Sequence, residues 1–153
     1  MTRRSYGIGD WIAVPLRESG FAVGLIARAS EAGVLLGYFF GPKRVDPPTL
    51  DELTELTAAD AALVRSFGHL GLTSGKWVVL GRLEGWDPKA WPMPKFVRYE
   101  ELTGRSIEVT YDDQDPNQIV HEHEMLPGPS EQLPKDGLLG AGAAEKLLTS
   151  LLG

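Results

Sequence analysis

Short apolar segments separated by tight turns run through most of this 153-residue chain, and this pattern constrains the fold more than any other feature. Residues 10–17, 21–28 and 33–40 are predicted to be three successive strands, the first two joined by a turn at Glu18-Ser19-Gly20. The third segment, GVLLGYFF, is almost entirely apolar, which is typical of a strand buried on both faces. Strands joined by short turns pair antiparallel, so we expect a meander at the start of the domain.

Pro15 interrupts the first of these segments, in the sequence DWIAVPL. A proline has no backbone N–H to donate to a neighbouring strand, so within sheets it is confined to edges and bulges. We therefore predict that Pro15 lies at a sheet edge or bulge. Because side chains alternate along a strand, Trp11 and Ala13 are expected on the same side.

The rest of the chain adds more strands and two helices. Thr49-Leu50-Asp51-Glu52 fits a capping box that starts a short helix over 50–56. Residues 61–70 contain alanines that suit a helix, but their apolar alternation favours a strand. The other predicted segments are a loop over 41–48, strands over 76–83, 95–100, 105–111 and 119–126, an irregular connection over 84–94, an acidic turn over 112–117 and a helix over 138–152.

These elements predict an α+β fold, mainly an antiparallel, strongly curled β-sheet with a short helix and a C-terminal helix. A partly open barrel is one form that such a sheet can take. The length suits one domain with its own core. We divide this single domain, 1–153, into a sheet-forming core over 6–126, a proline-containing linker over 127–136 and a terminal helix over 137–153.

The composition excludes several classes of protein. The chain contains no cysteine, which rules out disulfides, thiolate metal sites and cysteine nucleophiles. No apolar segment follows Arg3 and Arg4 as it would in a secretory signal, and no run approaches the roughly 18 apolar residues of a membrane span. We therefore expect a cytoplasmic protein without a membrane partner.

Acidic residues are concentrated in one part of the chain. The formal net charge is −6, and residues 100–124 contain eight acidic residues and one basic residue, a local charge of −7. An acidic field repels phosphates, so no nucleic-acid partner is expected. The same field attracts a basic partner, although it also suits a solvated surface that keeps the protein soluble.

The sequence IVHEHEM is the best candidate for a metal site. His121 and His123 project from the same face of a strand, about 7 Å apart. A third ligand is not fixed by spacing, although His69 or one of the neighbouring aspartates could supply it. The chain has no GxSxG elbow, and its glycine-containing sequences YGIGDW and LTSGKW lack the spacing of a phosphate loop. We predict no cofactor and no catalytic residue.

Two tryptophans, Trp86 and Trp91, lie in the irregular connection EGWDPKAWPMP. One interpretation is structural, with both indoles anchoring a long connection to the core. The other is functional, because tryptophan is enriched among the residues that dominate the energy of protein interfaces.

Three separated stretches carry a recognisable combination of residues. The first is GDWIAVPLRESGFAVG, the second is SGKWVVLG and the third is the start of PKFVRYEELTG. Their distinctive residues are Gly9, Asp10, Trp11, Ala13, Pro15, Leu16, Gly20, Gly24, Ser74, Gly75, Lys76, Trp77, Gly81, Pro94 and Phe96. In these residues and their order the chain resembles the immunity protein 26 family, which is found beside polymorphic toxins in bacteria.

The resemblance implies a non-enzymatic protein that binds and neutralises a cognate toxin in the producing cell. It supplies no catalytic residues, because the shared motifs form strands. Some proteins with the same family label are called phosphotriesterases, so a small metal-dependent hydrolase that uses His121 and His123 is an alternative. A generic peptide- or protein-binding barrel is a third reading.

We place toxin recognition on the acidic part of the chain. Like charges packed together repel one another, so a basic toxin would explain their presence, with carboxylates in the place of phosphates. Trp86 or Trp91 would add an apolar anchor if its loop lies beside the acidic turn. The predicted carboxylates are Asp112, Asp113, Asp115, Glu122 and Glu124.

Overall fold

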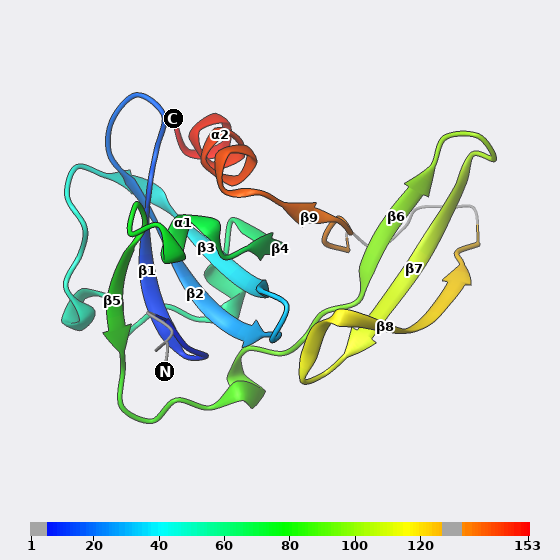
Figure 1. Cartoon of the computed structure of the whole chain (residues 1–153), viewed down its shortest axis with the longest axis horizontal. Helices are drawn as coiled ribbons and strands as arrows, with labels where there is room; N and C mark the ends of the chain where they lie inside the picture. Colours follow the sequence, from blue (N-terminus) through cyan, green and yellow to red (C-terminus); the bar gives the residue numbers. More distant parts are fainter. Residues whose placement is uncertain (1–5, 127–132) are drawn as a thin grey trace.

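The computed structural model describes residues 6–126 and 133–153, and it contains two β-sheets and one long helix (Figure 1). The strands are β1 (Asp10–Pro15), β2 (Phe21–Ala29), β3 (Val34–Arg44), β4 (Leu63–Gly68), β5 (Val78–Arg82), β6 (Phe96–Glu100), β7 (Arg105–Asp112), β8 (Asp115–Glu124) and β9 (Leu138–Leu139). The helices are α1 (Leu70–Thr73) and α2 (Ala141–Leu152), with 3-10 turns η1 (Leu50–Leu53), η2 (Ala58–Asp60) and η3 (Pro88–Ala90).

The first sheet has the strand order β5-β1-β2-β3-β4-β9, and the second has the order β6-β7-β8. Among the strands that the structure describes, β4 and β9 pair parallel and the other strand pairs are antiparallel. The predicted α+β class, with antiparallel sheets, a short helix and a C-terminal helix, is confirmed, but the segment predicted as a helix over 50–56 contains the 3-10 turn η1 and the short α-helix is α1. The strands that the structure describes form two open sheets (Figure 1), so the sheet does not close into a barrel.

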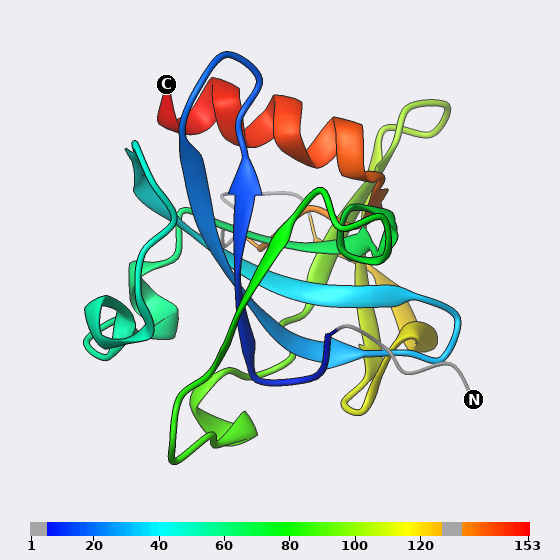
Figure 2. The same cartoon turned by 60° about the vertical axis from the view of Figure 1, so that its left-hand side comes forward.

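The first sheet is buried on both faces, and each face has its own apolar cluster. Alternate residues of β1 separate accordingly: Ile12 belongs to one cluster and Trp11 to the other. The cluster of Ile12 is covered by α2, which runs across the direction of β1 and β2 (Figure 2). The cluster of Trp11 is covered by the second sheet and the 84–94 connection, through residues such as Phe96 and Trp91.

Pro15 does not mark an edge strand, because β1 lies between β5 and β2. Its pairing with β5 ends at Ala13, so Pro15 itself has a strand neighbour on one side only. Leu16 donates its N–H to Gly20 across the β1–β2 hairpin, so the nitrogen of Pro15 points away from β2. The prediction that Pro15 marks an edge strand was wrong. Its nitrogen nevertheless points to the side where Pro15 has no strand partner, so no backbone hydrogen bond is lost there.

The C-terminal helix is shorter than predicted, because Leu138 and Leu139 form β9 beside β4. Residues 127–132 of the predicted linker lie outside the described residues. The segment that follows runs along β6, where Val97 donates to Pro134 O (2.9 Å) and accepts from the N–H of Asp136 (2.8 Å). The chain from 133 to 139 therefore joins the two sheets. The predicted loop over 41–48 is also partly strand, because β3 continues to Arg44.

Glu145 of α2 fixes the helix on the first sheet. Its carboxylate is buried and accepts a hydrogen bond from Trp77 Nε1 (2.9 Å). Lys76 Nζ lies 3.3 Å and Arg17 Nε 3.8 Å from the same carboxylate, and both cations are exposed. The indole and the carboxylate therefore satisfy each other within the core.

We predict that Glu145→Ala lowers the free energy of unfolding by about 2 kcal/mol, because it leaves the buried Trp77 N–H without an acceptor. Lys76→Gln, which removes only an exposed partner, should change it by less than about 1 kcal/mol. Urea denaturation followed by tryptophan fluorescence measures both, and equal losses would contradict the assignment.

Tyr111 of β7 donates a hydrogen bond to Asp136 and thereby ties the 133–137 segment to the second sheet. Burial raises the pKa of Tyr111 well above its ordinary value, and the hydrogen bond and charge of Asp136 raise it further. An unfolded tyrosine ionises near pH 10, roughly, so above that pH the unfolded chain releases a proton that the folded chain retains.

The stabilisation from Tyr111 is therefore complete below the unfolded pKa and declines as the pH rises through the folded pKa. We predict that Tyr111→Phe flattens the fall in unfolding free energy above roughly pH 10. Chemical denaturation at a series of pH values tests this, with Tyr99→Phe at an exposed position as the control. An unchanged alkaline slope in Tyr111→Phe would contradict the prediction.

Candidate functional site

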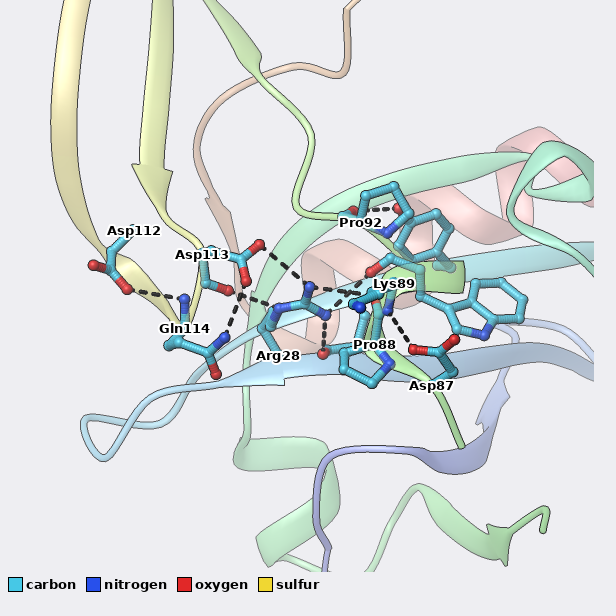
Figure 3. Close-up of polar contacts among 11 residues, drawn as sticks. Arg28, Asp87, Pro88, Lys89, Pro92, Asp112, Asp113 and Gln114 are labelled. Carbon is cyan, nitrogen blue, oxygen red and sulfur yellow. Dashed lines mark hydrogen bonds and ion pairs between the residues drawn. The ribbon is translucent and has the colours of Figure 1, made fainter. Parts of the chain in front are cut away.

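A buried arginine on β2 joins three segments that are distant in the sequence (Figure 3). Arg28 is 3% exposed. Its Nε donates to the carbonyl of Asp113 (2.7 Å) in the β7–β8 turn. Its Nη1 donates to the carbonyls of Ala27 (2.7 Å) and Trp91 (3.1 Å), and its Nη2 to that of Pro88 (3.4 Å). Arg28 therefore holds the acidic turn and the η3 segment on the first sheet.

Local hydrogen bonds shape the turn between β7 and β8. Asp112 Oδ1 accepts from the N–H of Gln114 (2.9 Å), and Asp115 Oδ1 accepts from the N–H of Asn117 (2.9 Å). These side chains fold the backbone as aspartates commonly do in turns. The carboxylate of Asp113 lies 3.4 Å from Arg28 Nη2 and accepts from Gln114 Nε2 (3.0 Å). The turn thus presents three carboxylates in a defined conformation.

The η3 segment is also fixed by its own sequence. Asp87 caps the turn by accepting from the N–H of Lys89 (3.0 Å), and Pro88 occupies the first helical position. Tyr38 donates a hydrogen bond to the carbonyl of Pro92, and burial raises the pKa of this phenol while the charge of Arg28 lowers it. A phenol that keeps its proton remains a donor to Pro92.

The turn and the η3 segment face each other across a groove of about 420 Å³ (Figure 3). The groove has Asp113 and Gln114 on the side of the turn and Pro88, Lys89 and Pro92 on the other side, with Arg28 also among its lining residues. The loop of the two tryptophans therefore lies beside the acidic turn. Arg28 and Lys89 were not predicted from the sequence as residues of the site. A charged residue within the apolar segment FAVGLIARA nevertheless indicates that a buried polar partner is present.

The two tryptophans of this loop have different surroundings. Trp91 is buried and packs edge-on against Trp11, Tyr38 and Phe40, with ring centroids 5.3–6.0 Å apart. Trp86 is half-buried, and together with Trp91 it lines a smaller cavity of about 140 Å³. Only Trp86 offers part of its ring to the surface.

The acidic residues predicted on β8 are separate from the turn. Asp112 pairs with Asp115, whereas Glu124 is opposite Ile107. The five residue steps from Ile107 to Asp112 span about 17 Å of strand, so Glu124 lies about that far from the turn. Glu122 lies 3.0 Å from Arg98 and Glu124 lies 3.5 Å from Arg105, so each has a counter-ion. The structure therefore brings together the three aspartates but not the two glutamates.

The imidazoles of His121 and His123 lie side by side on β8, with ring centroids 5.3 Å apart. His123 Nε2 is 3.7 Å from Glu108, and His69 lies elsewhere, with its Nδ1 hydrogen-bonded to Tyr6 (2.8 Å). Within residues 6–126 and 133–153, no group of three or more histidine or acidic side chains is arranged to hold a metal ion. Over the same ranges, none of the helices has the length and apolar character to cross a membrane.

Most of the residues that carry the family resemblance lie in the strands of the first sheet or next to them. Gly9 and Gly81 have positive φ angles of 92° and 118°. A Cβ on Gly24 would lie 2.9 Å from the ring of Phe39, so the close approach of β2 to β3 requires a glycine there. Asp10 begins β1, Pro15 ends it and Leu16 follows it, and Pro94 precedes β6.

We predict that Arg28→Met destabilises the protein by about 3 kcal/mol, because several buried carbonyls lose their donor together. Hydrogen exchange should increase in the β7–β8 turn and in residues 87–92. Arg105→Met, at an exposed ion pair, should change stability by less than about 1 kcal/mol. Unchanged exchange in both segments of Arg28→Met would show that Arg28 does not hold them.

The family comparison agrees with the resemblance seen in the sequence. The family described as Immunity protein 26 matches residues 7–107, which are 101 of the 153 residues. The matched range includes Arg28 and the η3 segment and ends within β7, before the acidic turn. Comparisons with curated proteins and with solved structures gave no match.

Proposed function

The chain belongs to the immunity protein 26 family, and from this we propose that it binds and neutralises a cognate protein toxin without catalysing a reaction. The family match over residues 7–107 is the observation that carries the proposal. We further propose that the toxin is basic and that it binds at the acidic turn and the η3 segment.

Charge and preorganisation support this choice of surface. The three aspartates of the turn contribute like charges at one end of the β7–β8 hairpin, beside a groove that also presents Lys89. Local caps and the Arg28 hydrogen bonds hold both walls, so binding would require little ordering of the backbone. Carboxylates on a fixed turn would raise the association rate with a basic toxin.

The remaining predicted residues take secondary roles in this proposal. Trp86 is the candidate apolar anchor, and Trp91 supports the η3 segment from within the core. Glu122 and Glu124 extend the acidic surface along β8, but their arginine partners reduce their contribution.

The test neutralises two aspartates while the fold is kept. In Asp112→Asn/Asp115→Asn, each asparagine retains the Oδ1 that accepts the turn N–H, and Asp113 is left in place beside Arg28. The matched control is Glu18→Gln/Glu101→Gln, which makes the same change in net charge at two exposed positions on other turns.

We predict that the aspartate variant associates with the toxin encoded by the neighbouring gene roughly tenfold more slowly at low salt, with a weaker salt dependence. The control should associate like the parent, and stopped-flow binding at several salt concentrations measures this. Equal association of the two variants would contradict the proposed surface. Failure of the parent to protect cells that co-express that toxin would contradict the immunity role itself.

A further inference from the structure

A second buried arginine, Arg65 of β4, is poorly satisfied in comparison with Arg28. Arg65 is 8% exposed, and its hydrogen bond runs from Nη2 to the carbonyl of Gly137 (3.1 Å). Its Nε is buried and has no hydrogen-bond partner among the residues that the structure describes. Arg28, with a similar burial, donates from Nε and from both terminal nitrogens. A buried donor without an acceptor is unfavourable and needs an explanation.

Arg65 lines a groove of about 560 Å³ between β4 and α2. This volume lies within the usual range for small-ligand sites. The walls include Leu63 of β4 and Leu147 and Leu151, which are one turn apart on α2. Lys135 adds a second cation at the groove. The site thus combines aliphatic walls with two positive side chains, on a protein whose net charge is −6.

Asp136, an acidic residue near Arg65, does not supply the acceptor that Arg65 Nε lacks. Asp136 accepts from Tyr111 and lies 3.6 Å from Arg98, so its carboxylate is engaged on the second sheet. Burial lowers the pKa of Arg65, whereas the charge of Asp136 raises it. Asp136 acts on Arg65 through its charge and not through a hydrogen bond.

The groove is open along the edge of the sheet. In the described part of the chain, β9 pairs only with Ser66 and Phe67 of β4. The β4 residues that line the groove, from Leu63 to Arg65, therefore have no strand on their outer side within that part. The groove thus offers space beside the guanidinium, and because Nε itself is buried, a ligand would reach it through a shift of the Arg65 side chain.

We propose that this groove binds a carboxylate attached to an aliphatic group, with Arg65 and Lys135 as its donors and the leucines as its apolar wall. A guanidinium matches the geometry of a carboxylate, and a charge-assisted hydrogen bond would satisfy the unused donors. Two sources present this chemistry: a free aliphatic acid, and the C-terminal residue of a polypeptide with an aliphatic side chain. The proposal is independent of toxin binding.

The experiment follows the arginine Nε–Hε resonances of the full chain by ¹H–¹⁵N NMR during titration. Octanoate represents the free acid, and acetyl-Ala-Leu with a free carboxylate represents the polypeptide. Octanamide, the peptide amide and inorganic phosphate are the controls. The Arg65 resonance should shift and saturate with at least one carboxylate probe, whereas that of the fully bonded Arg28 should not move.

Two variants test the donors and the wall. Arg65→Gln lacks the Arg65 resonance, so its binding is followed by the backbone amide shifts of the groove residues, and it should weaken binding by about tenfold or more. Leu151→Glu places a negative charge at the groove on a side chain that is 51% exposed, so it should weaken binding similarly without harm to the fold. Leu70→Glu makes the same change at an exposed position of α1 and should bind like the parent.

Saturation by octanoate alone identifies a free acid as the ligand, and saturation by the peptide alone identifies a polypeptide C-terminus. Either result supports the proposal. The proposal is wrong if neither carboxylate shifts the Arg65 resonance, if the amides bind equally well, or if phosphate binds as tightly as the better carboxylate. Unchanged binding in Leu151→Glu would also overturn it.

Discussion

Strands β2 and β3 bury both of their faces, so each face of the six-stranded sheet needs a covering layer of its own. Residues such as Ile26 pack on the side of α2, and residues such as Leu25 pack on the side of the second sheet. The second sheet is therefore placed by the apolar surface that it covers. The position of the β7–β8 turn beside the η3 segment follows from that packing, and Arg28 supplies the polar connection between them.

The sequence predicted features that depend on neighbouring residues. Gly20 has the positive φ (83°) expected of the β1–β2 turn, and the capping box at Thr49 is present. Features that depend on distant partners were missed. Leu138 and Leu139 have helical spacing with the residues after them, but pairing with β4 makes them a strand. Apart from that of the adjacent Ala27, the carbonyls that accept from Arg28 come from segments 60 and more residues away, so no local pattern indicates them.

The candidate site separates into a part inside the family match and a part outside it. Arg28 and the η3 segment lie within residues 7–107, whereas the acidic turn lies beyond them. Specificity between partners is a difference of affinities, and it can be altered by side chains on a fixed frame. In our proposal the frame is the sheet of this chain with Arg28, and the turn carries the charges that meet the toxin.

The joining of both sheets by residues 133–152 has a consequence for biosynthesis. This segment leaves the ribosome after every strand that it contacts, so the α2-facing cluster around Trp77 and Phe67 stays uncovered until then. An incomplete chain would expose this apolar face together with the β4 edge, a combination that favours aggregation and recognition by chaperones. The α2-facing side of the first sheet is therefore covered only after residues 133–152 have been translated.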